Sequence, residues 1–405
     1  MVAGIVALSR PEHLRLTDLQ VYTGAIDSLR NGAGLYDFAR NGNAPFTYPP
    51  FAALLMLPLA WLPTWLLHVA WTAGTALSAI GLALLFNRRA APLIALALML
   101  SAPVSSNFKY GQVSILLALL VATDVLALRH SRHQGVLIGI AAAVKLTPLI
   151  FIPMLWLTGR RRAAGIATAT FLASGTLAAY LLPAESWRYW TTEVQDVSRL
   201  GFITSAGNQS LNGALLRLDA PHRELLATLL AGTIAAIALW STTKLRNPQA
   251  HTARTRHPQM WLPKSRDPQT WPPKIRDPHM WLPEIRDPHT ALVITGAASV
   301  VLSPVSWTHH QVWLVFAAFL PLAPSLRIAT LTIMLLPMTA IDWWPFQESR
   351  LLLAITLALL LHTLLTRRPH PSAPHSSPAD LTPRPHTPHS PTSLRLGTLQ
   401  RRRTS

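Results

Sequence analysis

The sequence contains no cysteine, which excludes disulfide bonds and metal sites built on thiolates. Charge is scarce as well: only 13% of the 405 residues are charged, whereas average soluble domains carry roughly a quarter. Half of the residues are hydrophobic. The lack of charge and the excess of apolar residues disfavour a soluble domain and indicate a membrane protein.

Long apolar runs account for this composition. Five of them approach the ~20 residues that a helix needs to cross the hydrocarbon core, namely 65–86, 112–128, 163–182, 224–243 and 350–366. Others are shorter or interrupted by proline, namely 92–105, 134–157, 291–306, 311–325 and 327–341. So many apolar runs in one chain favour an all-α polytopic membrane protein over a soluble α/β protein.

The net charge of +18 would indicate a nucleic-acid partner if it were spread over a soluble surface. It is instead concentrated in part of the chain, which holds 24 of the 35 Lys and Arg residues and 5 of the 17 acids. That part comprises the short loops with Arg88, Arg129, Arg160 and Arg327 and the segments 244–290 and 367–405. Basic loops remain in the cytoplasm, so orientation explains the charge and we expect no nucleic-acid partner.

All these basic segments fall on one side of the membrane only if residues 134–157 enter and return on the same face. The segment contains Lys145, Pro148 and Pro153, and irregular backbone is tolerated at membrane depth where it lines a protein cavity. We therefore predict a broken helical hairpin. The predicted outer segments are then 9–50, 105–111, 183–223, 303–310 and 342–349.

The beginning of the sequence does not fit this topology by itself. Only MVAGIVAL, residues 1–8, precedes the first polar stretch, and this is too short to cross a membrane. Residues 9–50 nevertheless belong outside. We therefore expect that a further transmembrane helix precedes them in the native protein, and no cleavable signal peptide is visible.

Two segments have the composition of linkers. Residues 246–290 repeat a ten-residue unit such as RDPQTWPPKI, and each full unit carries proline, which breaks helices. The tail 367–405 has eight prolines and many Ser, Thr and His residues. We expect both to be extended and disordered in the cytoplasm, where their basic side chains can contact anionic headgroups. The predicted organisation is a transmembrane bundle, 1–366, with an insert at 244–290 and this tail.

A first candidate site lies in TDLQVYTGAIDSLRNG, residues 17–32. Its apolar residues recur at about 100° per residue, so we expect an amphipathic helix on the outer membrane surface. Thr17 and Gln20 match a capping box. Asp18 borders the apolar side, and it either complements the helix N-terminus or offers a carboxylate to a site above the bundle.

Other polar residues collect at the predicted outer face. Tyr48 precedes two prolines that fix an extended entry into an apolar helix. Asn107, Lys109 and Gln112 cluster at a helix start. Lys109 there can hold a lipid phosphate or simply extend to the membrane interface.

Lys145 lies inside the apolar hairpin, where a charge is costly and usually functional. It can bind a phosphate or form a structural pair with an acid such as Asp124. In the loop 183–223, Asn208 and Gln209 carry amides that can bond sugar hydroxyls or belong to a solvated turn.

His309 and His310 stand side by side between two apolar runs. Adjacent helical residues point about 100° apart, and no HxxxH or HExxH spacing accompanies them, so we expect no metal site. An imidazole that donates a hydrogen bond to a phosphate or a sugar hydroxyl is more natural. Together the candidates predict an outward-facing polar ring above an apolar bundle.

Seven short motifs follow one another in a specific order, namely DLQVY, FTYPPFAALLMLPLAWLP, GQVSILLALL, GVLIGIAAAVKLTPLIF, SWRYW, NQSLNG and SPVSWTHHQVW. In this order they resemble the polyprenol-phosphate-mannose-dependent mannosyltransferases of glycosyltransferase family 87, which act in the cell envelopes of actinobacteria. The resemblance runs from about residue 17 to residue 365, with the ten-residue repeat as an insertion.

The resemblance implies a GT-C-type transmembrane helix bundle with short external helices and loops. It implies an inverting α-1,2-mannosyl transfer on the extracytoplasmic face of the cell membrane, from a polyprenol-phosphate-mannose donor to a glycolipid or glycan acceptor, without a cofactor. Asp18 would be the single catalytic base. The residues expected to bind donor or acceptor are Tyr48, Asn107, Lys109, Gln112, Lys145, Asn208, Gln209, His309 and His310.

Two other functions remain open at this point. A multi-pass transporter or lipid flippase would also explain the bundle and the intramembrane Lys145, although no inverted repeat or pair of interrupted helices is evident. A scaffold protein would place the function in the repeat and the tail.

Reporter fusions test the predicted topology. We expect a reporter at residue 18 to lie outside the cell and a reporter in the repeat at 246–290 to lie inside, because basic segments stay in the cytoplasm. If both reporters were found in one compartment, the topology and the enzyme hypothesis that depends on it would fail together.

Overall fold

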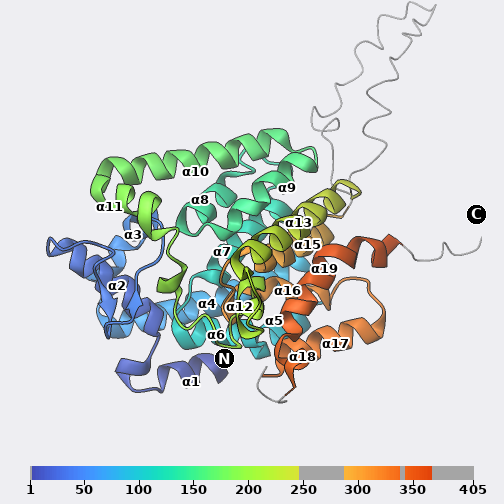
Figure 1. Ribbon diagram of the computed structural model, residues 1–405, viewed down its shortest axis with the longest axis horizontal. Helices are drawn as coiled ribbons and strands as arrows, with labels where there is room; N and C mark the ends of the chain where they lie inside the picture. The colour runs from blue at the N-terminus through green and yellow to red at the C-terminus, as the bar shows by residue number, and fades with distance from the viewer. Residues whose placement is uncertain (1, 246–286, 338–342, 367–405) are drawn as a thin grey trace, which may run out of the picture. The chain divides into compact units, whose positions relative to one another are not determined.

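Helices make up almost all of the regular structure in the computed structural model, which describes residues 2–245, 287–337 and 343–366 (Figure 1). The repeat and the tail fall almost entirely outside these ranges. The expectations that the repeat is a disordered cytoplasmic insert and that the tail is disordered therefore stay predictions.

The bundle contains helices suited to a bilayer. Among the described residues, three are long and apolar enough to cross a membrane, namely α4 (Thr64–Phe86), α10 (Arg161–Leu181) and α13 (Arg223–Thr243). A fourth span results if α5 (Ala91–Leu100) and α6 (Ala102–Tyr110) are counted together, although they meet at 61°. These helices, with the shorter apolar ones beside them, confirm the predicted all-α polytopic membrane protein.

The other helices are shorter. Those in the bundle are α3 (Pro50–Met56), α7 (Ser114–Ala122), α8 (Val136–Val144), α9 (Phe151–Leu157), α15 (Pro288–Leu302), α16 (Val312–Ala317), α17 (Pro324–Leu335) and α19 (Ser349–Thr366). Short helices and single turns connect them, namely α1 (Val2–Leu8), η1 (Glu12–Leu14), η2 (Leu57–Trp61), η4 (Thr147–Ile150), α11 (Pro183–Arg188), η5 (Tyr189–Glu193), η6 (Val197–Leu200), α12 (Leu211–Arg217), η8 (Thr308–His310) and α18 (Trp344–Gln347).

One run that was expected to approach a full span is shorter in the structure. The run 112–128 becomes α7 followed by a π-helical turn, η3 (Thr123–Ala127), so that its apolar helical part covers Ser114–Ala127. The difference has a local cause, because Asp124 in η3 turns its carboxylate to the start of α8. The run 350–366 is helical as expected and forms α19.

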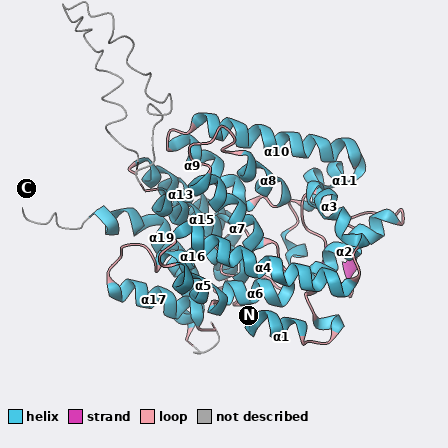
Figure 2. Ribbon diagram, turned by 180° about the vertical axis from the view of Figure 1, so that it is seen from behind, coloured by secondary structure: helices cyan, strands magenta, loops and turns pink. Residues whose placement is uncertain are grey.

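The predicted broken hairpin at 134–157 is present. α8 ends at Lys145, whose extended backbone leads into η4 and then α9. Both ends of the hairpin lie at the start of α10, where Arg160 Nη1 donates to Gln134 Oε1 at 2.8 Å. In Figures 1 and 2, α8 and α9 lie beneath α10. The chain therefore returns to the side from which it entered, with Lys145 near the tip.

Two glycines allow α8 to lie directly against α10. A Cβ atom on Gly135 would come within 2.1 Å of the carbonyl oxygen of Ala163, and one on Gly139 within 2.6 Å of that of Ala167. Gly135 also has φ +105°, a conformation that favours glycine. The close approach therefore depends on the absence of side chains at both positions.

Asp124 fixes the first turn of α8. Its buried carboxylate accepts hydrogen bonds from the backbone N–H groups of Gly135 at 2.8 and 2.9 Å, Leu137 at 2.9 Å and Ile138 at 3.2 Å. The N–H groups of a first helical turn have no partners within the helix, and a buried carboxylate is costly unless it is bonded. Asp124 thus anchors the hairpin to η3. The sequence had left open a structural pair of Asp124 with Lys145, and the structure shows these backbone contacts instead.

α2 (Thr17–Arg30) is the amphipathic helix that the sequence predicts, and it ends before Asn31 as expected. We had expected its apolar side to face the membrane surface. In the structure that side faces the protein instead, because Leu19, Tyr22 and Ile26 are buried. The helix packs on α3, η2 and α6.

The predicted capping box of α2 is wrong. Leu16, with φ 49°, precedes the helix, and no side chain caps the first turn. Gln20 instead donates through Nε2 to the carbonyl oxygens of Glu12 and Arg15, both at 2.7 Å. The side chain of Gln20 therefore holds the preceding loop rather than its own helix.

Two short strands, β1 (Ala39–Arg40) and β2 (Ala44–Pro45), pair antiparallel next to α2, with Ala39 opposite Pro45. In Figures 1 and 2, α2, α3 and α11 gather at the end of α10 where that helix stops. α15 packs between α13 and α19 and is buried along nearly its whole length. The bundle thus has its core around α15.

Substitution of Gly139 tests the α8–α10 contact. We expect Gly139→Ala to lower the free energy of unfolding by about 1–3 kcal/mol, as overpacked substitutions do, and to lower the melting temperature in detergent. The matched control is Gly165→Ala in α10, where an added Cβ meets nothing within 4 Å. Equal melting temperatures for the two variants would contradict the packing described here.

Candidate functional site

One cavity of about 530 Å³ opens where the outer segments converge. Four of the five predicted outer segments line it, together with the tip of the hairpin at 145–147. Its volume suits a small polar ligand or part of a larger one. The candidates that line it are Asp18, Tyr48, Gln112, Lys145, His309 and His310.

Asp18 stands at one end of a series of hydrogen bonds that runs through three other side chains. Gln112 Nε2 donates to Asp18 Oδ2, and the hydroxyl of Tyr48 donates to Gln112 Oε1 at 2.9 Å. The hydroxyl of Tyr22 lies 2.9 Å from that of Tyr48. Tyr22 comes from the apolar face of α2, where the sequence indicated only packing.

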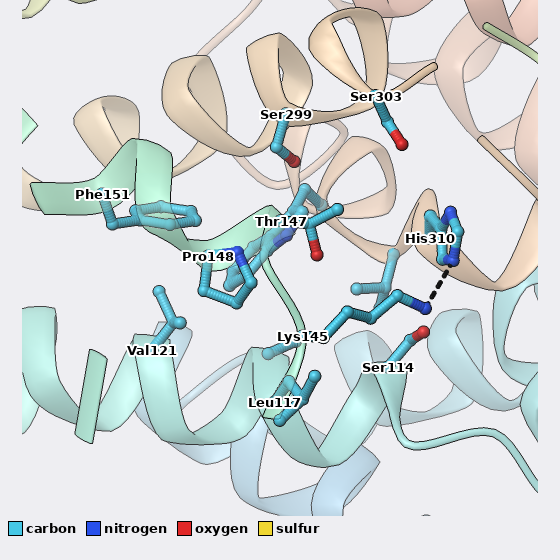
Figure 3. Close-up of a pocket in the computed structure, with 13 residues that line it drawn as sticks. Ser114, Leu117, Val121, Lys145, Thr147, Pro148, Phe151, Ser299, Ser303 and His310 are labelled. Atoms are coloured by element: carbon cyan, nitrogen blue, oxygen red, sulfur yellow. Dashed lines mark hydrogen bonds between the residues drawn. The ribbon is translucent and has the colours of Figure 1, made fainter. Parts of the chain in front are cut away.

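Lys145 approaches the same tyrosine from the hairpin. Its Nζ atom donates to the hydroxyl of Tyr48 at 3.3 Å and lies 5.0 Å from the centre of the Tyr48 ring. It also lies 2.8 Å from Nε2 of His310, as Figure 3 shows. Tyr48 therefore stands between the carboxylate of Asp18 and the cationic group of Lys145.

The two histidines form a pair at the cavity. Their rings meet edge to face with 4.4 Å between centroids, and His309 Nδ1 is buried without a hydrogen bond among the described residues. An ammonium group on Lys145 donates its hydrogen bond, so His310 Nε2 accepts it and the hydrogen of a neutral His310 ring lies on Nδ1. The imidazoles can thus offer donors to a ligand.

A small chamber of about 30 Å³ lies behind the contact of Lys145 with His310 (Figure 3). Hydroxyl side chains of Thr147, Ser299 and Ser303 line it beside apolar groups. It has room for about one or two water molecules.

Burial is the main influence on the protonation of Asp18. It raises the pKa of the carboxyl group, while the hydrogen bond from Gln112 and the positive charges of Lys145 and Arg40 act in the opposite direction. A carboxylate with a raised pKa is a better proton acceptor than an exposed one. The carboxyl group of Asp18 therefore has the environment of a general base.

An ion-pair network closes one wall of the cavity, and sequence reasoning missed it. Arg188 contacts Asp37 at 2.5 Å and Glu193 at 2.8 Å, and Arg199 also pairs with Glu193. Arg199 Nη2 donates to the carbonyl oxygen of Tyr36 at 2.9 Å. The hydrogen bond from Arg188 lowers the pKa of Asp37. The pair of Arg188 with Asp37 joins segments that lie far apart in the sequence, so it carries no local pattern.

Aromatic side chains form other parts of the wall. Tyr189 stacks on Tyr36 with 5.8 Å between ring centroids, and the hydroxyl of Tyr36 donates to the carbonyl oxygen of Tyr48 at 2.8 Å. Trp307 packs its ring against Gly207 and donates through Nε1 to the carbonyl oxygen of Leu200 at 3.2 Å. Tyr189 and Trp307 face the cavity, where rings of this kind provide apolar surface for a ligand.

Asn208 and Gln209 do not line the cavity. Both are fully buried, and their side chains bond to the protein itself. Asn208 Oδ1 accepts from the backbone of Ser306 at 2.9 Å, and Gln209 bridges the carbonyl oxygen of Gln347 and the N–H group of Leu351 at 2.8 and 3.0 Å. In this structure they brace the cavity wall, and their expected contact with a sugar stays a prediction.

Asn107 and Lys109 also lie off the cavity. Asn107 is buried and donates to the carbonyl oxygens of Pro103 at 2.9 Å and His309 at 3.4 Å, so it positions the histidine loop. Lys109 is exposed and lies over the ring of Tyr110 at 4.6 Å. Their expected roles in ligand binding stay predictions as well.

In the described part of the chain, no three His, Asp or Glu side chains are grouped as a metal site would require. What the cavity brings together is a buried carboxylate, a lysine with a histidine pair, and aromatic walls. This set can accept a proton at one point and stabilise negative charge at another.

Comparison with known proteins gives consistent results. The sequence model of glycosyltransferase family 87 matches residues 46–257. The chain is 29% identical over 309 residues to a "polyprenol-phosphate-mannose-dependent alpha-(1-2)-phosphatidylinositol mannoside mannosyltransferase" of Mycobacterium tuberculosis H37Rv, covering 71% of this chain and 64% of that protein. It is 30% identical over 323 residues to a related "phosphatidylinositol pentamannoside mannosyltransferase" of Mycolicibacterium smegmatis, covering 75% and 69%.

The chain thus spans about two thirds of the length of these relatives, namely 64% of the first and 69% of the second. No solved structure matches the chain.

Substitution of Asn208 tests whether the buried amides brace the wall. Asn208→Ala leaves the backbone N–H of Ser306 without its acceptor, so we expect a loss of about 1–3 kcal/mol of unfolding free energy and a lower melting temperature. Lys109→Ala, at an exposed position, is the control and should melt like the wild type. An unchanged melting temperature in Asn208→Ala would argue for ligand contact instead.

Proposed function

The chain belongs to glycosyltransferase family 87, and we propose that it moves mannose from a polyprenol-phosphate donor to a glycolipid acceptor on the extracytoplasmic face of the cell membrane. The observation that carries the proposal is the meeting of Asp18 and Lys145 at Tyr48, with His310 beside Lys145. A proton acceptor and an anion-binding group thereby face one cavity.

Asp18 acts as the single base in a direct displacement. A hydroxyl oxygen of the acceptor forms a bond to the anomeric carbon of the mannose and loses its proton to Asp18. The bond between the anomeric carbon and the phosphate oxygen breaks, and the electron pair leaves with the polyprenyl phosphate. Because one displacement occurs, the configuration at the anomeric carbon inverts. The phosphate is already a good leaving group, so the pair of carboxylates that glycosidases use is not required.

Lys145 and the histidine pair receive the phosphate. The approach of a phosphate gives Nζ of Lys145 an anionic acceptor in place of the neutral His310 ring. His309 Nδ1, which is buried without a hydrogen bond among the described residues, adds a further polar group at this end. Groups already fixed in the site stabilise the charge that develops on the leaving phosphate.

The names of the relatives support a glycolipid acceptor. The names of two similar proteins specify phosphatidylinositol mannosides, and we assign this chain an acceptor of the same class, a glycolipid whose sugar reaches the cavity from the membrane. The aromatic walls at Tyr189 and Trp307 suit a sugar ring. We expect no resident cofactor, because the donor already carries an activated sugar.

The location of the site supports an extracytoplasmic reaction. The exposed tryptophans Trp187 and Trp343 belong to predicted outer segments. Tryptophan is enriched where a protein meets the interface of a membrane. The basic loops at Arg129 and Arg160 meet at the base of the hairpin, whereas the cavity lies at its tip. This separation agrees with the positive-inside rule.

Asp18→Asn tests the proposal. We expect it to lower mannosyl transfer from labelled polyprenol-phosphate-mannose by at least about 10²-fold, as the loss of a general base does, while membrane insertion is unchanged. The control is Asp27→Asn on the same helix, where the exposed carboxylate pairs with Arg30. Wild-type transfer by Asp18→Asn would remove Asp18 from this role, and a wild-type protein that moves the donor across vesicles without forming product would favour the flippase.

A further inference from the structure

We infer that Gln112 is a positioning residue for the carboxylate of Asp18, and that the hydroxyl of Tyr48 decides which way the amide of Gln112 faces. The inference rests on the proposed function, in which Asp18 takes up a proton. It differs from the expectation that Gln112 binds a substrate directly. It also gives Tyr48 and Tyr22 a part in maintaining the base.

The number of hydroxyl hydrogens determines which group donates in each hydrogen bond of this series. Tyr48 has one hydroxyl hydrogen, and it donates this to Gln112 Oε1 at 2.9 Å. The hydroxyl of Tyr22, 2.9 Å from that of Tyr48, must then be the donor in their contact. Lys145 donates to Tyr48 as well. Tyr48 therefore accepts from two groups and donates to one.

The orientation of the amide follows from this direction. Because Oε1 of Gln112 accepts from Tyr48, the NH₂ group of Gln112 lies at the other end and donates to Asp18 Oδ2. A reversed amide would set its oxygen against the carboxylate and would remove the acceptor of the Tyr48 hydroxyl hydrogen. Gln112 is thus held in the one orientation that favours the charged form of Asp18.

The backbone around Gln112 is shaped for this contact. Gly111 has φ +70°, and a Cβ atom there would lie 2.8 Å from Cβ of Leu19 and 3.0 Å from Cβ of Leu16. These leucines flank the start of α2 that carries Asp18. The turn between α6 and α7 therefore presses against α2, and this brings Gln112 within reach of the carboxylate.

Other groups that face Asp18 come from several elements. Lys145 on the hairpin and Arg40 on β1 act through their positive charges, and Thr17 adjoins Asp18 on α2. Tyr22 and Tyr48 are the neighbouring phenols. Among these groups, Gln112 is the side chain that donates directly to Oδ2. Its removal should affect the protonation of Asp18 without moving a charge.

The test is the pH dependence of kcat/KM for mannosyl transfer by the full-length protein in membranes. Gln112→Met keeps the size of the side chain but removes the amide. The carboxylate of Asp18 loses a donor that lowers its pKa. We therefore expect the acid limb of the kcat/KM profile to move to a pH about one unit higher. At neutral pH we expect kcat to fall about tenfold, with KM for the donor little changed.

Gln134→Met is the matched control. Gln134 is as buried as Gln112, with 5% and 6% of the residue exposed, but it bonds at the base of the hairpin. A merely structural loss would lower the yield or the melting temperature of both variants and leave the pH profile in place.

Tyr48→Phe is a second variant, which frees the amide of Gln112 to reverse. It should shift the acid limb of the pH profile in the same direction as Gln112→Met.

The outcomes separate this inference from the proposed function. If the wild type forms no mannosylated lipid, or if Asp18→Asn remains active, the proposed function fails. If the wild type is active and Asp18→Asn is not, an unchanged acid limb in both Gln112→Met and Tyr48→Phe overturns the positioning role. A raised KM with an unchanged pH profile would show that Gln112 contacts the substrate, as the sequence alone had suggested.

Discussion

The site depends on the non-helical break at Lys145 in the hairpin 134–157, and on the contacts that hold this hairpin within the bundle. Irregular backbone at membrane depth persists only where its polar groups are satisfied by the protein or by a cavity. Asp124 satisfies the start of α8 through three backbone N–H groups, and Gly135 and Gly139 let α8 lie directly on α10. These contacts fix the base of the hairpin. Lys145 near the tip is then carried to Tyr48 and His310.

The sequence predicted much of this arrangement because the strongest signals were physical constraints on a membrane chain. Charge in the loops and proline near Lys145 predicted the hairpin, and the polar pieces between apolar runs predicted a common outer site. The contribution of Tyr22 was hidden, because a tyrosine on an apolar stripe has the pattern of a core residue. The pairing of Arg188 with Asp37 was equally hidden, since it joins two segments that lie far apart in the sequence.

The polar motifs separate into two kinds once they are placed. Gln112 and His309 line the cavity, whereas Asn208 and Gln209 are buried behind it and bond to backbone groups. A sequence pattern does not distinguish the two, because an amide has the same donors and acceptors in either place. Their position relative to the cavity decides between them. In a bundle with few charges, a buried amide network is an effective way to fix the shape of a loop.

The position of Tyr48 has a consequence for the order of events. Its hydroxyl is the only bridge in the described site between the acid side, through Gln112, and the cation side, through Lys145. In the proposed reaction, a phosphate that drew Lys145 away would remove one hydrogen bond from that hydroxyl and change how strongly it donates to Gln112. By thermodynamic reciprocity, proton uptake at Asp18 would then alter the affinity for the phosphate. Under that proposal, binding of the lipid carrier and the protonation of the base would be coupled through a single phenol.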